Sequence, residues 1–343
     1  MATDTRDILI DDLTKLKAEL ISYGRIQIPK DIQKHISIER PKSGPSSGEK
    51  VIGLEFGGKR VKLRISDNPE RFVLEEDEKG LIIKEHNRIR ARAKSLDLRY
   101  HAPGQLFISI ENRCIYSCLF CTAGNISIPE KRLLDFVRKA IDSGNIKSVA
   151  ITSGVYPSIE DHINKIERFV RIIKTSYPDI PLGVEPVVKS DEHISRLYSA
   201  GADEIKINVQ TANRELFDRI CGYMDYDKIF DFLQSAVDIF GRGKVMSNVI
   251  YGIGESDADV VKTMERIADI GAVPNPRAIR VNPEIKKRFE RKGCGVGEVN
   301  PDRIIRIAQI LKKILQERNL STKNLKTMCF PCGCCDVIPF QDI

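Results

Sequence analysis

From about residue 105 onward, the chain alternates between short apolar strands and amphipathic helices. Six candidate strands are spread over about 180 residues, close to the ~30 residues of one strand–helix–strand repeat. This alternation implies a parallel sheet with right-handed crossovers, either doubly wound or curved into a barrel. The candidate strands span 105–110, 148–153, 181–188, 204–210, 244–253 and 278–283, and the candidate helices span 130–143, 160–176, 191–200, 214–219, 227–240, 257–271 and 301–319.

The first 104 residues have a different pattern. Residues 5–23 have the apolar spacing of a helix, and the polar stretch 41–50 is typical of a loop. Two alternating runs, 51–56 and 60–65, flank a Gly-Gly-Lys sequence and predict a β-hairpin. The basic segment 81–99 is interpreted as a solvated helix face, with binding of RNA or an acidic substrate as the alternative. We therefore expect an N-terminal helical and β-hairpin extension (1–104), an α/β barrel (105–320) and a cysteine-rich tail (321–343).

Composition narrows the class of protein. No apolar run approaches the ~18–20 residues that a membrane span needs, and the acidic N-terminus lacks the features of a secretory signal. We expect a cytoplasmic protein without a membrane partner. The net charge of +7 is spread along the chain, which argues against a nucleic-acid partner. In a reducing compartment, clustered cysteines indicate metal or redox ligands rather than disulfides.

Three cysteines follow the first candidate strand. Cys114, Cys118 and Cys121 have the spacing C-x3-C-x2-C. Three thiolates in one loop can hold three corners of a cubic iron–sulfur cluster and leave the fourth iron without a protein ligand. Such an open position binds an exogenous ligand, as an open catalytic zinc site does. The aromatic Phe120 would help to exclude water. A zinc knuckle lacking its fourth ligand, or unrelated buried cysteines, are the alternatives.

This motif, in its place after the first of six strands, resembles that of the radical S-adenosylmethionine (radical SAM) superfamily, over roughly residues 103–320. The resemblance implies an α/β fold, a partial (β/α)6 TIM-type barrel with its site at the carboxyl ends of the strands. It also implies a [4Fe–4S] cluster on Cys114, Cys118 and Cys121 with S-adenosylmethionine on the fourth iron. In that family, one electron from a donor such as ferredoxin or flavodoxin cleaves the cofactor to a 5′-deoxyadenosyl radical, which abstracts hydrogen from substrate.

Further positions resemble the family's cofactor-binding segments. Residues 152–154, Thr-Ser-Gly, stand where the family has a Gly-Gly-Glu-like turn, and 248–255 resemble its G-x-I-x-G-x-x-E segment. Polar residues at other strand ends occupy places that contact cofactor or substrate in relatives, although each could simply bind loop backbone. The residues expected in cofactor or substrate contact are Phe120, Thr152, Ser153, Gly154, Glu185, Asn208, Gln210, Ile250, Gly252, Glu255, Arg280 and Asn282.

The tail offers four more thiols, Cys329, Cys332, Cys334 and Cys335, within seven residues. This density favours a second [4Fe–4S] cluster, held by three of the four and an external or remote ligand, since adjacent cysteines do not easily bind one ion together. Structural zinc, redox-active or sulfur-carrying thiols, and an inert tail are the alternatives. Cys294 could be the remote ligand, whereas Cys221 is expected to pack as a small apolar residue.

The resemblance extends to a type of reaction. In the biotin synthase and lipoyl synthase relatives, a second cluster is consumed as the sulfur source, and auxiliary clusters lie across the barrel mouth. The strand cysteines of biotin synthase are missing here, so the chain looks more like the archaeal lipoyl synthases. We expect a transferase that inserts sulfur into a small-molecule or protein-tethered substrate. The alternatives are a radical SAM enzyme that forms or rearranges C–C bonds or methylates, with the second cluster as electron relay, and a non-catalytic iron–sulfur carrier.

Overall fold

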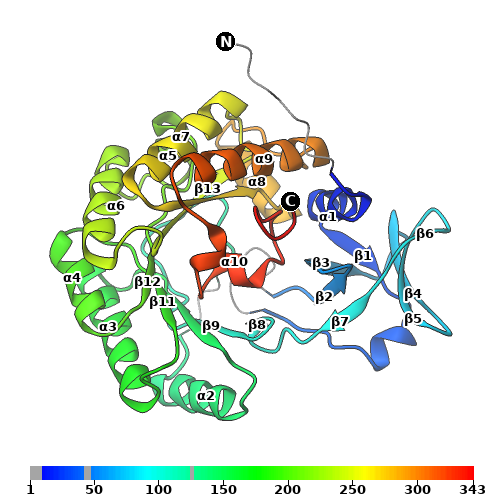
Figure 1. Ribbon diagram of the computed structural model, residues 1–343, viewed down its shortest axis with the longest axis horizontal. Coiled ribbons are helices and arrows are strands. Elements are labelled where there is room, and N and C mark those ends of the chain that lie inside the picture. Colours follow the sequence, from blue (N-terminus) through cyan, green and yellow to red (C-terminus); the bar gives the residue numbers. More distant parts are fainter. Residues whose placement is uncertain (1–9, 42–47, 124–126) are drawn as a thin grey trace.

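The computed structural model describes residues 10–41, 48–123 and 127–343. Their strands form two seven-stranded sheets, ordered β6-β5-β4-β1-β3-β2-β7 and β14-β13-β12-β11-β10-β9-β8. Figure 1 shows the sheets side by side, with the C-terminal segment between them. Parts of the predicted helix 5–23 and loop 41–50 lie outside the described residues. No described helix is long and apolar enough to cross a membrane.

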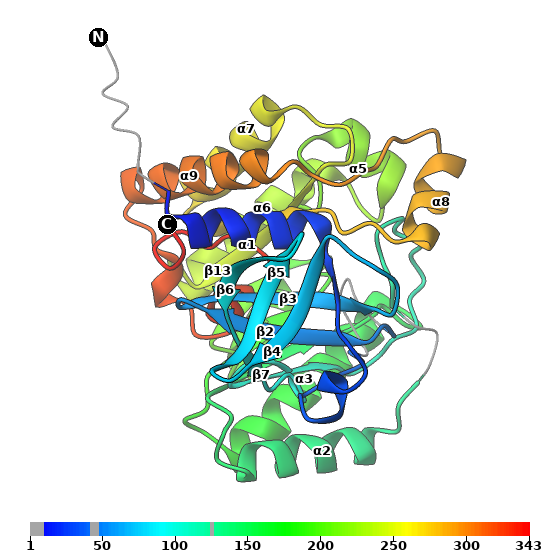
Figure 2. The same cartoon turned by 90° about the vertical axis from the view of Figure 1, so that its right-hand side faces the viewer.

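The first sheet contains the predicted hairpin. Its strands β2 and β3 pair antiparallel through a turn at Gly57 and Gly58, whose φ angles of 53° and 76° favour glycine. Helix α1 packs on β3 and on α9, and lies across this sheet in Figure 2. The elements are α1 (Asp12–Tyr23), β1 (Arg25–Gln27), the 3-10 helix η1 (Ile32–Lys34), β2 (Val51–Phe56), β3 (Lys59–Ser66), β4 (Phe72–Asp77), β5 (Gly80–Glu85), β6 (Arg88–Arg92) and β7 (Lys94–Leu96).

The expected helix face at 81–99 is wrong, because this segment forms β5, β6 and β7. Apolar residues alternate with charged ones along the sequence of β6, where Ile89 is exposed and Ala91 is buried. Several of the cations are also paired with carboxylates: Lys84 with Glu75 at 2.7 Å, and Arg92 with Asp77 at 2.8 Å. The basic residues therefore stabilise strand pairing instead of forming one free cationic face.

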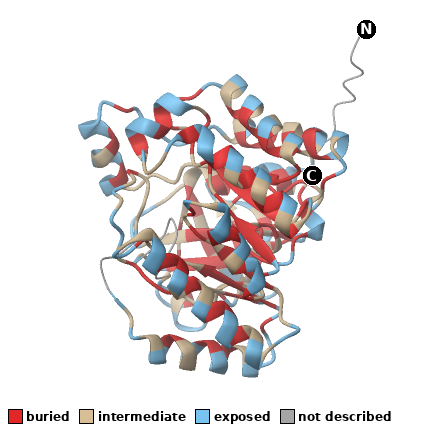
Figure 3. Cartoon of the chain, turned by 90° about the vertical axis from the view of Figure 1, so that its left-hand side faces the viewer, coloured by how far each residue is buried: buried red, intermediate tan, exposed pale blue. Residues whose placement is uncertain are grey.

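The second sheet is the predicted partial barrel. Strands β9 to β14 are parallel, β8 is antiparallel to β9, and the helices cover the outside of the curled sheet (Figure 1). In Figure 3 the strands are largely buried and the outer helix faces are exposed. The elements are β8 (His101–Ala102), β9 (Gln105–Ser109), α2 (Glu130–Asp142), β10 (Ser148–Thr152), α3 (Ile159–Ser176), β11 (Leu182–Glu185), α4 (Asp191–Ser199), β12 (Glu204–Lys206), α5 (Arg214–Ile220), α6 (Tyr226–Phe240), β13 (Val245–Tyr251), α7 (Asp257–Ile270) and β14 (Val273–Ala278).

The last strand lies earlier than predicted. It is β14, at 273–278 instead of 278–283, and it contains Pro274 and Pro276. Proline lacks the N–H of a sheet ladder, so this segment does not look like a strand in the sequence, but an edge strand tolerates it. Among the described strands, β14 is such an edge, since it pairs with β13 alone. The following helix α8 (Pro283–Arg291) was not predicted.

The tail enters the barrel at the amino ends of its strands. Helix α9 (Pro301–Glu317) is followed by η2 (Thr322–Asn324) and the short α10 (Cys329–Cys332). The carboxylate of Glu204, the first residue of β12, accepts hydrogen bonds from the backbone N–H of Lys326 and from both N–H and hydroxyl of Thr327. At the start of β9, the side-chain amide of Gln105 binds both backbone groups of Met328. Two strand ends therefore recognise the tail backbone.

The N-terminal extension holds the tail from the other side. Lys17 in α1 is completely buried, and its Nζ donates to the Gly333 carbonyl at 2.8 Å and to Asp342 Oδ2 at 2.6 Å. The backbone N–H of Lys62 in β3 donates to the Cys334 carbonyl at 2.8 Å. The extension and the barrel thus hold the cysteine segment between them.

We expect Lys17→Met to lower the free energy of unfolding by about 3–5 kcal/mol, because it leaves the Asp342 carboxylate buried without its cation. Denaturant unfolding of the full-length protein measures the change. The control is Lys15→Met on the same helix, whose exposed ion pair with Asp12 contributes less than about 1 kcal/mol. If the two substitutions lower the free energy of unfolding equally, the buried Lys17–Asp342 ion pair does not have this stabilising role.

Candidate active site between two cysteine triads

A cavity of about 330 Å³ lies inside the curled sheet. Alternate residues of the strands face it, as the two-residue period requires: Gln105, Phe107 and Ser109 from β9 all line it. Cysteines approach it from two segments. Cys114, Cys118 and Cys121 come from the loop after β9, and Cys329, Cys332 and Cys335 come from the tail.

Backbone hydrogen bonds fix the loop that carries the first triad. The N–H of Ile115 donates to the Val155 carbonyl at 2.8 Å, and that of Leu119 donates to the Ile220 carbonyl at 3.0 Å. Cys114 is exposed, while Cys118 and Cys121 are half-buried. The Cys221 thiol, expected only to pack, hydrogen-bonds to Cys118 and lowers the pKa of that thiol. The loop therefore presents three thiols to the cavity independently of any bound group.

Glu111 anchors the start of this loop. Its carboxylate accepts hydrogen bonds from the Asn112 and Arg113 N–H groups, from the Arg113 guanidinium and from Lys165. Burial acts to raise its pKa, but these hydrogen bonds outweigh burial and lower the pKa of Glu111 to about 2. Its own carbonyl accepts the Gly154 N–H at 2.7 Å, which joins the loop to the end of β10.

We expect Glu111→Gln to lower the free energy of unfolding at pH 7 by about 2 kcal/mol, since charge-assisted hydrogen bonds are lost. The parent should lose this advantage as the pH falls from 4.5, the ordinary pKa of Glu, to about 2, where the folded carboxylate takes up its proton. Denaturant unfolding of both proteins between pH 2 and 7 measures the difference. Glu215→Gln, at an exposed ion pair, is the control. If the two proteins differ in their free energy of unfolding by the same amount at pH 2.5 and at pH 7, the charge of Glu111 does not stabilise the parent.

Most of the residues expected to contact cofactor line this cavity. They are Phe120, Thr152, Ser153, Gly154, Glu185, Asn208, Gln210, Ile250 and Arg280. Gly154 needs its small size, because a Cβ there would lie 2.2 Å from the Arg113 carbonyl oxygen. Gln210 has a φ of 68°, a strained conformation of the kind that clusters at functional sites.

Three expected residues lie outside the cavity lining. The Glu255 carboxylate is buried and accepts hydrogen bonds from the N–H groups of Gly252 and Ile253, at 2.7 and 3.0 Å, and from Arg303. Asn282 caps α8, since its side chain accepts the Ile285 N–H at 2.8 Å. A Cβ at Gly252 would lie 2.4 Å from Val299. These residues shape the turns around the barrel and do not face the cavity.

Three of the four tail cysteines line the cavity and one does not. Cys329, Cys332 and Cys335 line the cavity, with the spacing C-x2-C-x2-C that iron–sulfur proteins use. Cys334 is completely buried and is not among the lining residues, and its thiol donates to the Cys332 carbonyl at 3.3 Å. The suggested remote ligand Cys294 is instead buried among apolar residues near Leu119 and Phe289.

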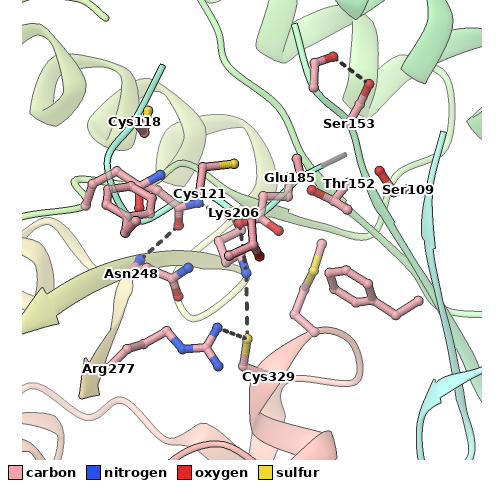
Figure 4. Close-up of a pocket in the computed structure, with 18 of the residues that line it drawn as sticks. Ser109, Cys118, Cys121, Thr152, Ser153, Glu185, Lys206, Asn248, Arg277 and Cys329 are labelled. Carbon is pink, nitrogen blue, oxygen red and sulfur yellow. Dashed lines mark hydrogen bonds and ion pairs between the residues drawn. The ribbon is translucent and has the colours of Figure 1, made fainter. Parts of the chain in front are cut away.

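A buried lysine and a half-buried arginine flank Cys329. Lys206 Nζ lies 3.6 Å from its sulfur and 3.1 Å from Glu185, and Arg277 Nη1 lies 3.7 Å from the same sulfur (Figure 4). Burial acts to lower the pKa of Lys206, but Cys329 and Glu185 outweigh burial and raise it. Sequence reasoning missed both cations. In the predicted strand 204–210, polar residues alternate with apolar ones at Glu204, Lys206 and Asn208. This alternation could have indicated that Lys206 faces the inside of the barrel.

The residues present fit iron–sulfur clusters better than a single ion. Each triad contributes three thiols to the lining of the cavity, while within the described chain no three side chains of metal-binding type form a site for a single ion. A cubic cluster does not need such a site, because each thiolate binds a different iron. The cations near Cys329 would offset thiolate charge.

Comparison with known proteins identifies a family model and several relatives that this chain resembles. Residues 108–267 match the family model "Radical SAM superfamily". The chain is 26% identical over 138 residues to a probable GTP 3′,8-cyclase of Saccharolobus islandicus, and 29% identical over 133 residues to a biotin synthase of Cutibacterium acnes. These matches cover 39% and 38% of this chain and 44% and 36% of the relatives, so the chain spans less than half the length of either curated relative.

Solved structures support the fold. The FeFe-hydrogenase maturase HydG from Carboxydothermus hydrogenoformans has a TM-score of 0.52 at 13% identity, covering 62% of this chain and 52% of HydG. A second HydG structure has a TM-score of 0.51 at 15% identity, covering 66% and 52%. At such low identity the likeness concerns the fold alone. The matched family model and the cysteine motif in the loop after the first barrel strand support the radical SAM superfamily for this chain.

Proposed function

We propose that this radical SAM enzyme inserts sulfur into a C–H bond of its substrate, with a second [4Fe–4S] cluster on the tail as the sulfur source. One observation carries the proposal: Cys329, Cys332 and Cys335 line the same cavity as Cys114, Cys118 and Cys121. A substrate in this cavity would lie between the place where a radical is generated and a store of sulfide. The volume of about 330 Å³ suits a small molecule or the end of a protein-tethered chain.

The superfamily implies a [4Fe–4S] cluster, S-adenosylmethionine and a one-electron donor. When bound, the cluster supplies the electron that cleaves the cofactor. Cys114, Cys118 and Cys121 would hold it, and Phe120 would limit water beside the third thiolate. Ser153 and Gly154 at the end of β10 offer polar groups for the amino acid part of the cofactor, and Asn208 and Gln210 after β12 offer hydrogen-bonding groups for the ribose.

The tail triad lies deeper in the barrel than the loop triad. In Figure 4, Glu185 and Lys206 lie between Cys121 on one side and Cys329 on the other. Lys206 and Arg277 would stabilise the negative charge of the thiolates in this buried place. Phe107 and Met328 add apolar surface to the cavity wall. The cavity thus has charged side chains beside the tail thiols and apolar side chains elsewhere in its lining, which suits a substrate that has an unactivated C–H bond.

Isotope transfer tests sulfur insertion even while the substrate is unidentified. Two portions of the protein are reconstituted, one with ³²S-sulfide and one with ³⁴S-sulfide, mixed equally, and incubated with S-adenosylmethionine, a reductant and an extract of small molecules and proteins. Mass spectrometry should find products as ³²S/³⁴S doublets, with at most about one product per chain because the cluster is consumed. The control is the variant with Cys329, Cys332 and Cys335 changed to Ala, which should give no doublets.

A second candidate is a radical SAM enzyme that forms C–C bonds, with the tail cluster as electron relay. The similarity to a probable GTP 3′,8-cyclase favours it, as do the cations Lys62, Lys206, Arg277 and Arg280 along the cavity, which suit an anionic substrate. The same experiment separates the two functions. Many turnovers with an intact tail cluster and no labelled product would contradict sulfur insertion and support the relay.

A further inference from the structure

His101 in β8 has an unusual backbone and an unused nitrogen. Its φ of 81° lies in the left-handed region, which a residue with a side chain rarely adopts. Its Nδ1 is buried and has no hydrogen-bond partner. Among the described residues that line the cavity, only one other buried side-chain nitrogen or oxygen lacks a partner, Nη2 of Arg280. Strain and an orphaned polar atom in one residue point to a function.

The structure ties His101 to the tail segment that carries the triad. Lys62 bonds to both: its backbone N–H donates to the Cys334 carbonyl at 2.8 Å, and its Nζ donates to the His101 carbonyl at 2.9 Å. The next residue, Ala102, packs in one buried cluster with Cys332 and Cys334. The imidazole stacks on Phe107, with ring centroids 4.8 Å apart and planes 25° apart. The ring is thus held in one orientation beside the cysteine segment, on the wall of the shared cavity.

The other polar groups at this end of the cavity are already engaged or lack a lone pair. Glu185 is bonded to Lys206 and Asn208, and Gln105 to Met328. The protonated guanidinium of Arg280 has no lone pair for a metal. The Cys334 thiol points to a carbonyl. Three thiolates leave one iron of a cubic cluster without a protein ligand, and imidazole nitrogen is an established iron ligand in iron–sulfur proteins.

We propose that Nδ1 of His101 is the fourth protein ligand of the tail cluster. This inference rests on the proposed second cluster and names its remaining ligand. A histidine in place of a thiolate raises the reduction potential of an iron–sulfur centre, because a neutral ligand stabilises the oxidised irons less. The tail cluster should therefore have a higher midpoint potential than a variant in which a thiolate takes this place. It should also resist loss of iron better than a cluster with three ligands.

The test uses the full-length chain with Cys114, Cys118 and Cys121 changed to Ala, so that the tail cluster is observed alone. The protein is labelled with ¹⁵N-histidine, reconstituted, reduced with dithionite and examined by pulsed electron paramagnetic resonance. A strong coupling to a directly bound ¹⁵N is expected. His101→Gly, which accommodates the positive φ, should abolish that coupling. His101→Cys should restore tight iron binding with a lower midpoint potential. His35→Gln, at an exposed histidine outside the cavity lining, is the matched control and should keep the coupling.

The outcomes separate this inference from the proposed function. If about four irons per chain are bound in the tail but no strong ¹⁵N coupling is found, His101 is not a ligand and the second cluster stands. If the coupling survives His101→Gly, another histidine is the ligand. If the parent with the three alanines binds no iron, the second cluster itself is contradicted, and this assignment with it.

Discussion

Alanine at any one of Cys114, Cys118 and Cys121 should reduce the release of 5′-deoxyadenosine from S-adenosylmethionine to the level of a protein-free control. An incomplete set of thiolates no longer holds a cluster with one open iron, so the cofactor is neither bound nor reduced. Anaerobic incubation of the reconstituted protein with dithionite, followed by chromatography of the nucleosides, measures the effect. The fold should be retained, because backbone hydrogen bonds to Val155 and Ile220 hold this loop.

Two other cysteines serve as matched controls for this prediction. Cys221→Ser keeps a hydrogen-bonding group beside Cys118, and Cys294→Ala changes a buried thiol outside the cavity. Both variants should still cleave S-adenosylmethionine. Release of 5′-deoxyadenosine by the protein with all three alanines would contradict the assignment of the loop as the radical-generating site.

Local sequence patterns predicted the barrel well and its last strand poorly. The alternation of strand and helix from residue 105 identified β9 to β13, because each buries an apolar run against amphipathic helices. It failed at β14, where Pro274 and Pro276 hide an edge strand. It failed again at 81–99, where charged side chains pair with carboxylates of the neighbouring strand β4, such as Glu75 and Asp77. Pairing between strands has no signature within one segment. The division at 104 and 320 stays a prediction.

The same limit explains which features of the candidate site could be predicted from the sequence. The C-x3-C-x2-C motif is local, so its place after the first barrel strand could be predicted. The path of the tail depends on contacts that join residues more than a hundred positions apart, such as Glu204 with Thr327 and Lys17 with Asp342. Glu255 lies in a segment that resembles a cofactor-binding one, and its carboxylate also has a local structural role, because it binds the turn it follows. The roles of the cavity residues toward cofactor stay predictions.

Removal of the tail thiols should separate cofactor cleavage from product formation. The variant with Cys329, Cys332 and Cys335 changed to Ala should bind about four irons per chain, where the parent binds about eight. It should still cleave S-adenosylmethionine, because the loop triad comes from a different segment of the chain. It should form no sulfur-containing product. Iron and sulfide analysis, nucleoside release and the isotope experiment measure the three quantities in one preparation.

Cys334→Ala is the matched control, since this thiol lies in the same seven residues but does not line the cavity. It should keep about eight irons and form product like the parent, apart from a modest loss of stability from its buried position. If Cys334→Ala loses the second set of irons while Cys335→Ala keeps it, the ligand assignment is reversed. Zinc in place of iron in the parent tail would contradict both the sulfur source and the electron relay, because zinc carries neither sulfide nor an accessible redox change.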